Sequence, residues 1–460
     1  MYNGRKTSDS AAPFPRYAMN PNLQIFLDRE APYHRIPDIY EDEVNYNKDY
    51  YSRQNFQLCG TIFRQRNRNF LLIFAGILFI FLFLMFSFDR HSADIEDNRV
   101  YTKMSEDSTA TQMPLVAQTL AIPKENMEKC LSAYLSSIDP NEKYPDDVNQ
   151  IKPHHIRVIG SMGDSLTIGS RASNFVEQSG TQYPGNAYFT GMDSEVDGHL
   201  TIYNIFRYIA GIRGTQLFGG STGQNYGPNS GLNVAVGGRK SDDIPRQAKD
   251  LVERIRKIDG INIKEDWKLV SLWIGTNDVG NLGYGDVDPI PPQDYKEKIA
   301  EGLLYLKENL PRTIVTVIAM FEPELLQEAN SILTTGKRAK DIENQQKIDK
   351  LTEGYRQAVY DIQNDKKFQS SEFTVVVQPF ATKYSTPYKD KLGNYNTAFY
   401  GYDLFHTGKL GHAIIAKHYW QNLFEKVGSK TDKADLGDTT QEIYHLDKDN
   451  SYIKTVGNSG

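Results

Sequence analysis

Five residues, spread over four short stretches of the chain, have the chemistry needed for attack on a carbonyl group. They are Ser165, Gly238, Asn277, and the pair Asp403 and His406. A serine hydroxyl becomes a strong nucleophile when an imidazole accepts its proton and a carboxylate orients that imidazole. Backbone and amide N–H groups can stabilise the negative charge that forms on the carbonyl oxygen. The residue types therefore indicate nucleophilic catalysis by a serine.

Each stretch has a simpler explanation when it is taken alone. The GDS stretch that ends at Ser165 and the GTND stretch of 275–278 have the composition of ordinary turns. The GGRKS stretch of 237–241 could be a plain strand-to-helix turn with a serine cap. A lone D-x-x-H stretch is too short to be specific, and His412 fits the start of a helix. Only the joint occurrence in this order favours a catalytic site.

The elements that would position these stretches alternate along the chain from residue 151. Short apolar runs predict buried strands, and runs with a helical apolar period predict amphipathic helices between them. The expected strands are Ile156–Met162, Leu232–Val236, Leu269–Ile274, Thr313–Ala319 and Phe373–Val377. The expected helices are Asp242–Ile258, Asp294–Asn309 and His412–Phe424.

Alternating strands and helices predict an α/β fold with a central parallel sheet covered by helices on both faces. In such sheets, ligands bind outside the carboxyl ends of the strands. GDS, GGRKS and GTND follow the first three expected strands, so we expect these stretches to meet at one edge of the sheet.

Together these motifs resemble the SGNH/GDSL hydrolase family over roughly residues 151–425. The resemblance implies a three-layer α/β/α sandwich. It also implies that Ser165 is the nucleophile, His406 the general base and Asp403 the residue that orients it. The oxyanion hole would be formed by the Ser165 N–H, the Gly238 N–H and the Asn277 amide. No metal or cofactor is expected.

The phospholipase B branch of this family is more similar still. It resembles this chain in MGDSLTIG, LNVAVGGRKSDDIPRQA, LWIGTNDVGN and YDLFHTGKLGHAIIAKHYW, and in IYNIFRYI at 202–209. The implied substrates are acyl esters of phospholipids or lysophospholipids. Leu404 replaces the usual cysteine, Arg239 replaces a small residue, and Cys130 lacks its usual partner. We therefore expect Cys130 to be free or paired with another molecule.

Other classes of protein remain as alternatives. An α/β-hydrolase would have its serine in G-x-S-x-G, whereas Thr167 stands at the second glycine position. A metallophosphoesterase would need several histidines and carboxylates at strand ends, and His154 and His155 precede the first strand. A carbohydrate or other small-ester esterase would have the same catalytic residues. A catalytically silent receptor or scaffold with this fold is the non-enzyme alternative.

Bulk composition excludes one further class. The 460 residues have a formal net charge of -6, so no basic excess is present to neutralise the phosphates of a nucleic acid. The two cysteines, Cys59 and Cys130, cannot form a framework of several disulfides. Nucleic acid is therefore not expected as a partner.

A strongly apolar segment predicts membrane attachment. Residues 70–88, FLLIFAGILFIFLFLMFSF, contain no charged residue and are long enough to cross the hydrocarbon core as a helix. We expect a disordered cytosolic tail at 1–69 and a juxtamembrane stalk and lead-in at 89–150. The hydrolase domain would span 151–425, followed by a C-terminal tail at 426–460. The lipid substrate and the membrane are thus the expected partners.

The charges that flank this segment predict its orientation. Arg64, Arg66 and Arg68 lie directly before it, and such clusters favour the cytosolic side. A single-pass type II protein is expected, with the catalytic domain luminal or extracellular. Protease added to the cytosolic face of sealed vesicles should remove the N-terminal tail and leave the catalytic domain intact. Cleavage of the catalytic domain under these conditions would reverse the orientation.

Overall fold

The computed structural model describes residues 119–139, 141–173, 181–280, 288–322, 342–384, 397–401 and 403–460. The expected tail at 1–69, the apolar segment at 70–88 and the first part of the expected stalk and lead-in, at 89–118, lie outside the described residues. Within these ranges, no helix combines the length and apolar character needed to cross a bilayer.

A four-stranded parallel sheet forms the centre of the fold. The strands are β1 (Ile156–Gly163), β2 (Trp267–Trp273), β3 (Thr313–Ile318) and β4 (Phe373–Gln378), in spatial order β1-β2-β3-β4. Gly163 at the end of β1 pairs in register with Trp273 at the end of β2. All four strands are buried along almost their whole length, as expected when helices cover both faces. The predicted parallel α/β fold is confirmed.

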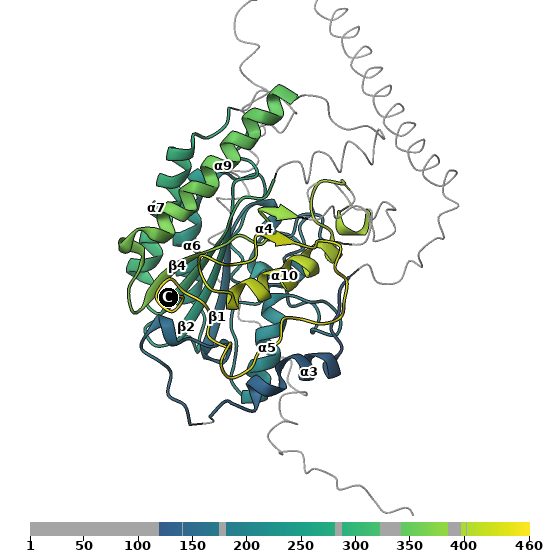
Figure 1. Ribbon diagram of the computed structural model, residues 1–460, viewed down its shortest axis with the longest axis vertical. Coiled ribbons are helices and arrows are strands. Elements are labelled where there is room, and N and C mark those ends of the chain that lie inside the picture. The colour runs from purple at the N-terminus through teal and green to yellow at the C-terminus, as the bar shows by residue number, and fades with distance from the viewer. Residues whose placement is uncertain are drawn as a thin grey trace, which may run out of the picture. The chain divides into compact units, whose positions relative to one another are not determined.

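Helices lie on both faces of the sheet (Figure 1). On one side are α6 (Ile244–Arg256), α7 (Pro292–Asn309) and α9 (Ile342–Asn364), and on the other α5 (Ile202–Arg213) and α10 (Lys409–Phe424). The short α4 (Ser165–Ile168) follows β1 directly, and α3 (Lys124–Leu135) precedes the sheet. A separate pair, β5 (Lys383–Tyr384) and β6 (Lys433–Ala434), is also parallel.

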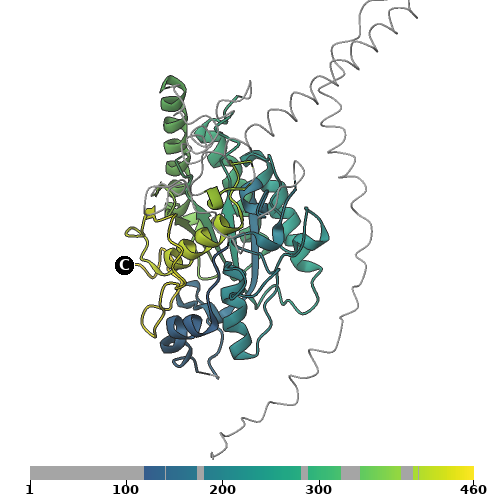
Figure 2. The same ribbon diagram turned by 90° about the vertical axis from the view of Figure 1, so that its right-hand side faces the viewer.

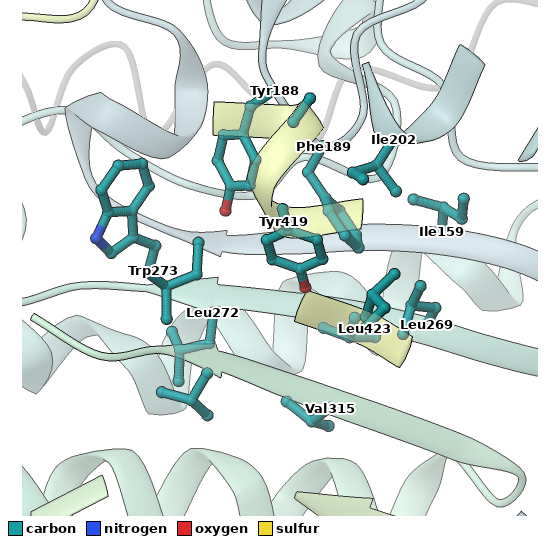
Figure 3. Packing of buried hydrophobic residues seen from close by; sticks show 14 of the residues in the cluster. Ile159, Tyr188, Phe189, Ile202, Leu269, Leu272, Trp273, Val315, Tyr419 and Leu423 are labelled. Atoms are coloured by element: carbon teal, nitrogen blue, oxygen red, sulfur yellow. The ribbon is translucent and has the colours of Figure 1, made fainter. Parts of the chain in front are cut away.

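The core between α10 and the sheet is rich in aromatic rings (Figure 3). Tyr419 and Leu423 of α10 face Leu269 and Val315 of the strands, and all four are fully buried or nearly so. The Tyr188 ring meets the Trp273 ring edge-on at 5.5 Å between centroids. This packing fixes α10 against the sheet. The loop that carries His406 leads directly into this helix.

The prediction of a strand at Leu232–Val236 is wrong. The segment runs beside β1 and exchanges hydrogen bonds with it at Ser161, but it forms only the single bridge Ser161–Asn233. The Asn233 side chain accepts a hydrogen bond from the Ala235 N–H at 3.2 Å and donates to the Thr167 carbonyl at 2.9 Å. A side chain that bonds to nearby backbone competes with a regular ladder, and here it ties the segment to the turn that carries Ser165.

The folded core extends beyond the expected limits of 151 and 425. Buried side chains come from the lead-in and from the C-terminal segment, and both views place that segment beside α3 (Figures 1 and 2). The Leu446 N–H donates to the Cys130 carbonyl at 3.1 Å, and Lys129 forms an ion pair with Glu442. Cys130 is free and buried. The core residues from these two segments are Leu120, Ile122, Met127, Cys130, Leu131, Tyr134, Val148, Ala434, Leu436, Ile443, Leu446 and Ile453.

Candidate active site

Ser165 lies in a tight turn between β1 and α4. The Asp164 side chain caps this helix by accepting the Leu166 N–H at 3.0 Å, and Ser165 is the first helical residue, 8% exposed. A Cβ atom on Gly163 would lie only 2.1 Å from the Trp273 carbonyl oxygen. Only glycine therefore allows β1 to turn so close to the end of β2.

Asp164 has a structural role at this turn. Burial raises the pKa of Asp164 to about 7, and the nearby charge of Asp278 adds to this effect. Hydrogen bonding from Leu166 and Thr276 acts to lower the pKa of this carboxyl. The capping bond to Leu166 is the contact that this carboxyl makes next to the candidate nucleophile.

Gln247 of α6 holds the last residue of β1. Its Oε1 accepts the Gly163 N–H at 2.8 Å, and its Nε2 donates to the Gly163 carbonyl at 2.9 Å. A buried amide here satisfies both backbone groups at the point where the strand ends. Our sequence reasoning did not assign this role, although a glutamine between Ile244 and Ala248 is a polar residue on the apolar stripe of the helix.

The glycine pair forms a β-turn against the nucleophile. The Arg239 N–H donates to the Val236 carbonyl at 3.3 Å, and Gly238 has φ +76°, which fits the third position of a type II turn. An added Cβ on Gly237 would lie 3.8 Å from Ser165 Cβ. The structure thus brings two of the predicted motifs into contact.

Asn277 is fastened to the same turn. Its Nδ2 donates to the Arg239 carbonyl at 2.9 Å, which uses one of its two amide hydrogens. Within the described residues, neither the Ser165 N–H nor the Gly238 N–H has an acceptor. The predicted oxyanion donors therefore belong to neighbouring turns and retain unused N–H groups.

A second bond between these turns comes from Asp278, which our sequence reasoning left without a role. This buried carboxylate accepts the Ser241 N–H at 2.9 and 3.1 Å, and it also accepts the Ser241 hydroxyl. Burial raises the pKa of Asp278 to about 6, and the bonds from Ser241 act in the opposite direction.

Asp403 and His406 are paired on one loop. His406 Nδ1 lies 2.6 Å from Asp403 Oδ2, and the N–H groups of Phe405 and His406 donate to Oδ1. Burial alone would raise the pKa of Asp403, but the bonds from His406 and Phe405 outweigh it and lower the pKa below its usual value. An ionised carboxylate can only accept, so Nδ1 carries the proton and Nε2 is left as a base.

The backbone closes this loop tightly. The Gly401 N–H donates to the His406 carbonyl at 2.7 Å, and Leu404 adopts φ +52°. A left-handed conformation is uncommon for leucine, and it lets two successive N–H groups reach the Asp403 carboxylate. Leu404 is thus compatible with the Asp403–His406 pair.

Contacts also join this loop to the nucleophile turn. Leu166, which follows Ser165, and Thr407, which follows His406, line the same apolar cavity of about 10 Å³. Arg171 Nε lies 3.5 Å from Asp403 Oδ2. The candidate base and the candidate nucleophile therefore sit on loops that pack together.

His412 supports the loop that carries Asp403 and His406. It is buried in the first turn of α10, where its Nδ1 accepts the Tyr188 N–H at 3.2 Å and its Nε2 lies 3.1 Å from Thr407 Oγ1. Burial lowers the pKa of His412 to about 3. A neutral imidazole bonded on both nitrogens positions Thr407 and has no nitrogen left for catalysis.

The only group of metal-ligand type within the described ranges is Glu142, His154 and His155. His154 Nε2 lies 3.1 Å from Glu142 Oε2. The Lys152 N–H donates to His155 Nδ1 at 3.1 Å, so Nε2 of that ring carries the proton and offers no lone pair. The Lys152 ammonium lies 3.7 Å from the same carboxylate. These contacts fit a hydrogen-bonded cluster better than a metal site.

Comparison with known proteins identifies the family of this chain. The family model for GDSL-like lipase/acylhydrolase matches residues 159–419. The human protein named phospholipase B1, membrane-associated, is 30% identical over 328 residues, which cover 68% of this chain and 22% of that protein. Its rat counterpart is 30% identical over 336 residues, with 70% and 22% covered. The chain thus spans less than a quarter of the length of these relatives.

Among solved structures, an acetylxylan esterase of Geobacillus stearothermophilus, solved as a catalytic mutant, is 14% identical with a TM-score of 0.31. The match covers 56% of this chain and 90% of that one. A score at this level adds nothing to the family match.

The contact between Gln247 and Gly163 yields a testable prediction. Gln247→Leu leaves the buried Gly163 N–H without its acceptor, so the free energy of unfolding should fall by about 1–3 kcal/mol. The turn that carries Ser165 should also loosen, which lowers kcat. Urea unfolding and ester hydrolysis measure the two effects. Glu253→Ala, at an exposed site on the same helix, is the control. A Gln247→Leu variant with unchanged stability would show that this contact does not hold the turn.

Proposed function

Because this chain belongs to the GDSL-like lipase/acylhydrolase family, we propose that it is a membrane-anchored serine esterase that hydrolyses acyl esters of phospholipids or lysophospholipids. The observation that carries the proposal is the 2.6 Å contact between His406 Nδ1 and Asp403 Oδ2, on a loop that packs against the turn of Ser165. In the proposal, His406 Nε2 is the base that accepts the Ser165 proton, and the Nδ1–Asp403 contact supports this role by placing the ring proton on Nδ1.

The proposed reaction has two steps. Ser165 Oγ attacks the ester carbonyl carbon while its proton moves to His406 Nε2. The tetrahedral intermediate then collapses, and His406 returns the proton to the departing alcohol oxygen, which leaves the acyl group on Ser165. Water repeats the sequence on this acyl-enzyme and releases the fatty acid. Asp403 stabilises the imidazolium that forms in each step.

Charge on the carbonyl oxygen would be stabilised by three donors. They are the N–H groups of Ser165 and Gly238 and the second amide hydrogen of Asn277. The proposal is supported by the two backbone N–H groups that lack acceptors among the described residues and by the bond that fixes Asn277 to the Arg239 carbonyl. Donors held rigidly in advance need no reorganisation when charge develops.

The substrate and the membrane are linked in this proposal. The relatives carry the name phospholipase B1, membrane-associated, and the apolar segment at 70–88 provides an anchor for a type II protein. A hydrolase tethered next to a bilayer encounters lipid at a high effective concentration. Lipid acyl esters are therefore the proposed substrates, and acetylated sugars are the competing ones.

The proposal is tested by Ser165→Ala in the full-length protein. Loss of the nucleophile should lower kcat on phospholipid and lysophospholipid by about 10⁴–10⁶-fold and leave thermal unfolding unchanged. Ser132→Ala, at an exposed site on α3, is the matched control. Wild-type turnover in Ser165→Ala would remove this serine from the mechanism. Faster hydrolysis of acetylated sugars than of every lipid by the wild-type enzyme would contradict the proposed substrate.

A further inference from the structure

Two positively charged residues stand at the end of the turn that contributes Gly238 to the candidate oxyanion hole. Arg239 and Lys240 directly follow Gly238, and both are half-buried. Lys240 Nζ donates to the Asp288 carbonyl at 3.1 Å, and its charge also acts on Asp278. The Arg239 side chain makes no hydrogen bond or ion pair within the described part of the chain. Of the two, Arg239 is the cation whose side chain has no bonding partner among the described residues.

Two acids near this turn, Asp243 and Asp278, already have partners, and a third, Asp242, is exposed to solvent. Asp243 accepts two bonds from Arg246, at 2.8 and 2.9 Å. Asp278 is buried and accepts bonds from Ser241. Although the chain has a net charge of -6, no acid among the described residues pairs with the guanidinium of Arg239, which belongs to the turn that contacts Ser165 through Gly237. An anion supplied from outside the protein could bind there without displacing an internal ion pair.

The backbone of Arg239 is fixed although its side chain is not paired. Its N–H bonds to the Val236 carbonyl, and its own carbonyl accepts Asn277 Nδ2 at 2.9 Å. Gly237 in the same turn lies against Ser165. The Arg239 backbone is therefore held one residue from the Gly238 N–H, so its side chain starts from a fixed point close to the donor that would bind the ester carbonyl.

The chemistry of a glycerophospholipid matches this placement. Its phosphodiester is separated from the ester carbonyl by only a few bonds of the glycerol backbone, whereas a monoacylglycerol carries no anion there. Guanidinium groups bind phosphate through paired, charge-assisted hydrogen bonds. Resting on the function proposed above, we propose that Arg239 is a specificity-determining residue that binds the substrate phosphate and selects phosphate-bearing acyl esters over neutral ones.

The test compares two lipids with the same acyl chain in mixed detergent micelles, using the full-length protein. Lysophosphatidylcholine carries the phosphate and monoacylglycerol does not. Arg239→Gln should lower kcat/KM on lysophosphatidylcholine by about 10–100-fold, mainly through KM, because a charged hydrogen-bond pair is lost. Hydrolysis of monoacylglycerol should be unchanged. Arg239→Lys should recover part of the activity on lysophosphatidylcholine because it retains the charge.

Arg256→Gln serves as the control, because this exposed arginine at the far end of α6 bonds to Asn309. Equal losses on both lipids in Arg239→Gln would overturn the proposal and assign Arg239 to the shape of the turn. Unchanged activity on both lipids would also overturn it, while leaving the proposed function intact. A wild-type enzyme that cleaves monoacylglycerol but not lysophosphatidylcholine would refute the proposed phospholipid substrate itself.

Discussion

A buried carboxylate, that of Asp278, joins the two turns on which the candidate site depends. It accepts both the backbone N–H and the hydroxyl of Ser241, so the turn after β2 is tied to the end of the GGRKS stretch. An ionised group without water is costly unless hydrogen bonds compensate for lost hydration, which explains why the adjacent serine supplies two donors. With this link in place, Asn277 reaches the Arg239 carbonyl, and Gly237 of the same turn lies against Ser165.

The parallel sheet supplies the second constraint. Because β1 and β2 end in register at Gly163 and Trp273, the turns that follow them emerge side by side. Gln247 then fixes the end of β1 from the helical layer, and α10 supports the His406 loop through His412 and Thr407. The candidate nucleophile, base and oxyanion donors therefore come from segments far apart in sequence. Helix α6 holds the first, helix α10 supports the second, and bonds between turns hold the Gly238 and Asn277 donors.

The pattern of apolar residues along the chain was sufficient to predict most of the strands. Four strands follow the apolar runs closely, and the GDS and GTND stretches follow two of them, as expected for parallel strands. The segment 232–236 does not form a regular strand because the Asn233 side chain bonds to the backbone of Ala235 and Thr167, which apolar character does not reveal. The roles of Gln247, Asp278 and His412 depend on partners distant in the sequence, and the contacts between α3 and residues 426–460 are equally non-local. No periodicity within one segment encodes such contacts.

The central claim is that neighbouring turns present three donors to one oxyanion, and Asn277 is the donor that a substitution can remove. Asn277→Ala should lower kcat by about 10²–10³-fold and leave KM nearly unchanged, because the interaction strengthens only as charge develops on the carbonyl oxygen. Steady-state kinetics on a lysophospholipid, with thermal unfolding measured in parallel, decide the matter. A folded variant with this selective loss of kcat is the predicted result, and a folded variant with near-normal kcat would contradict the account.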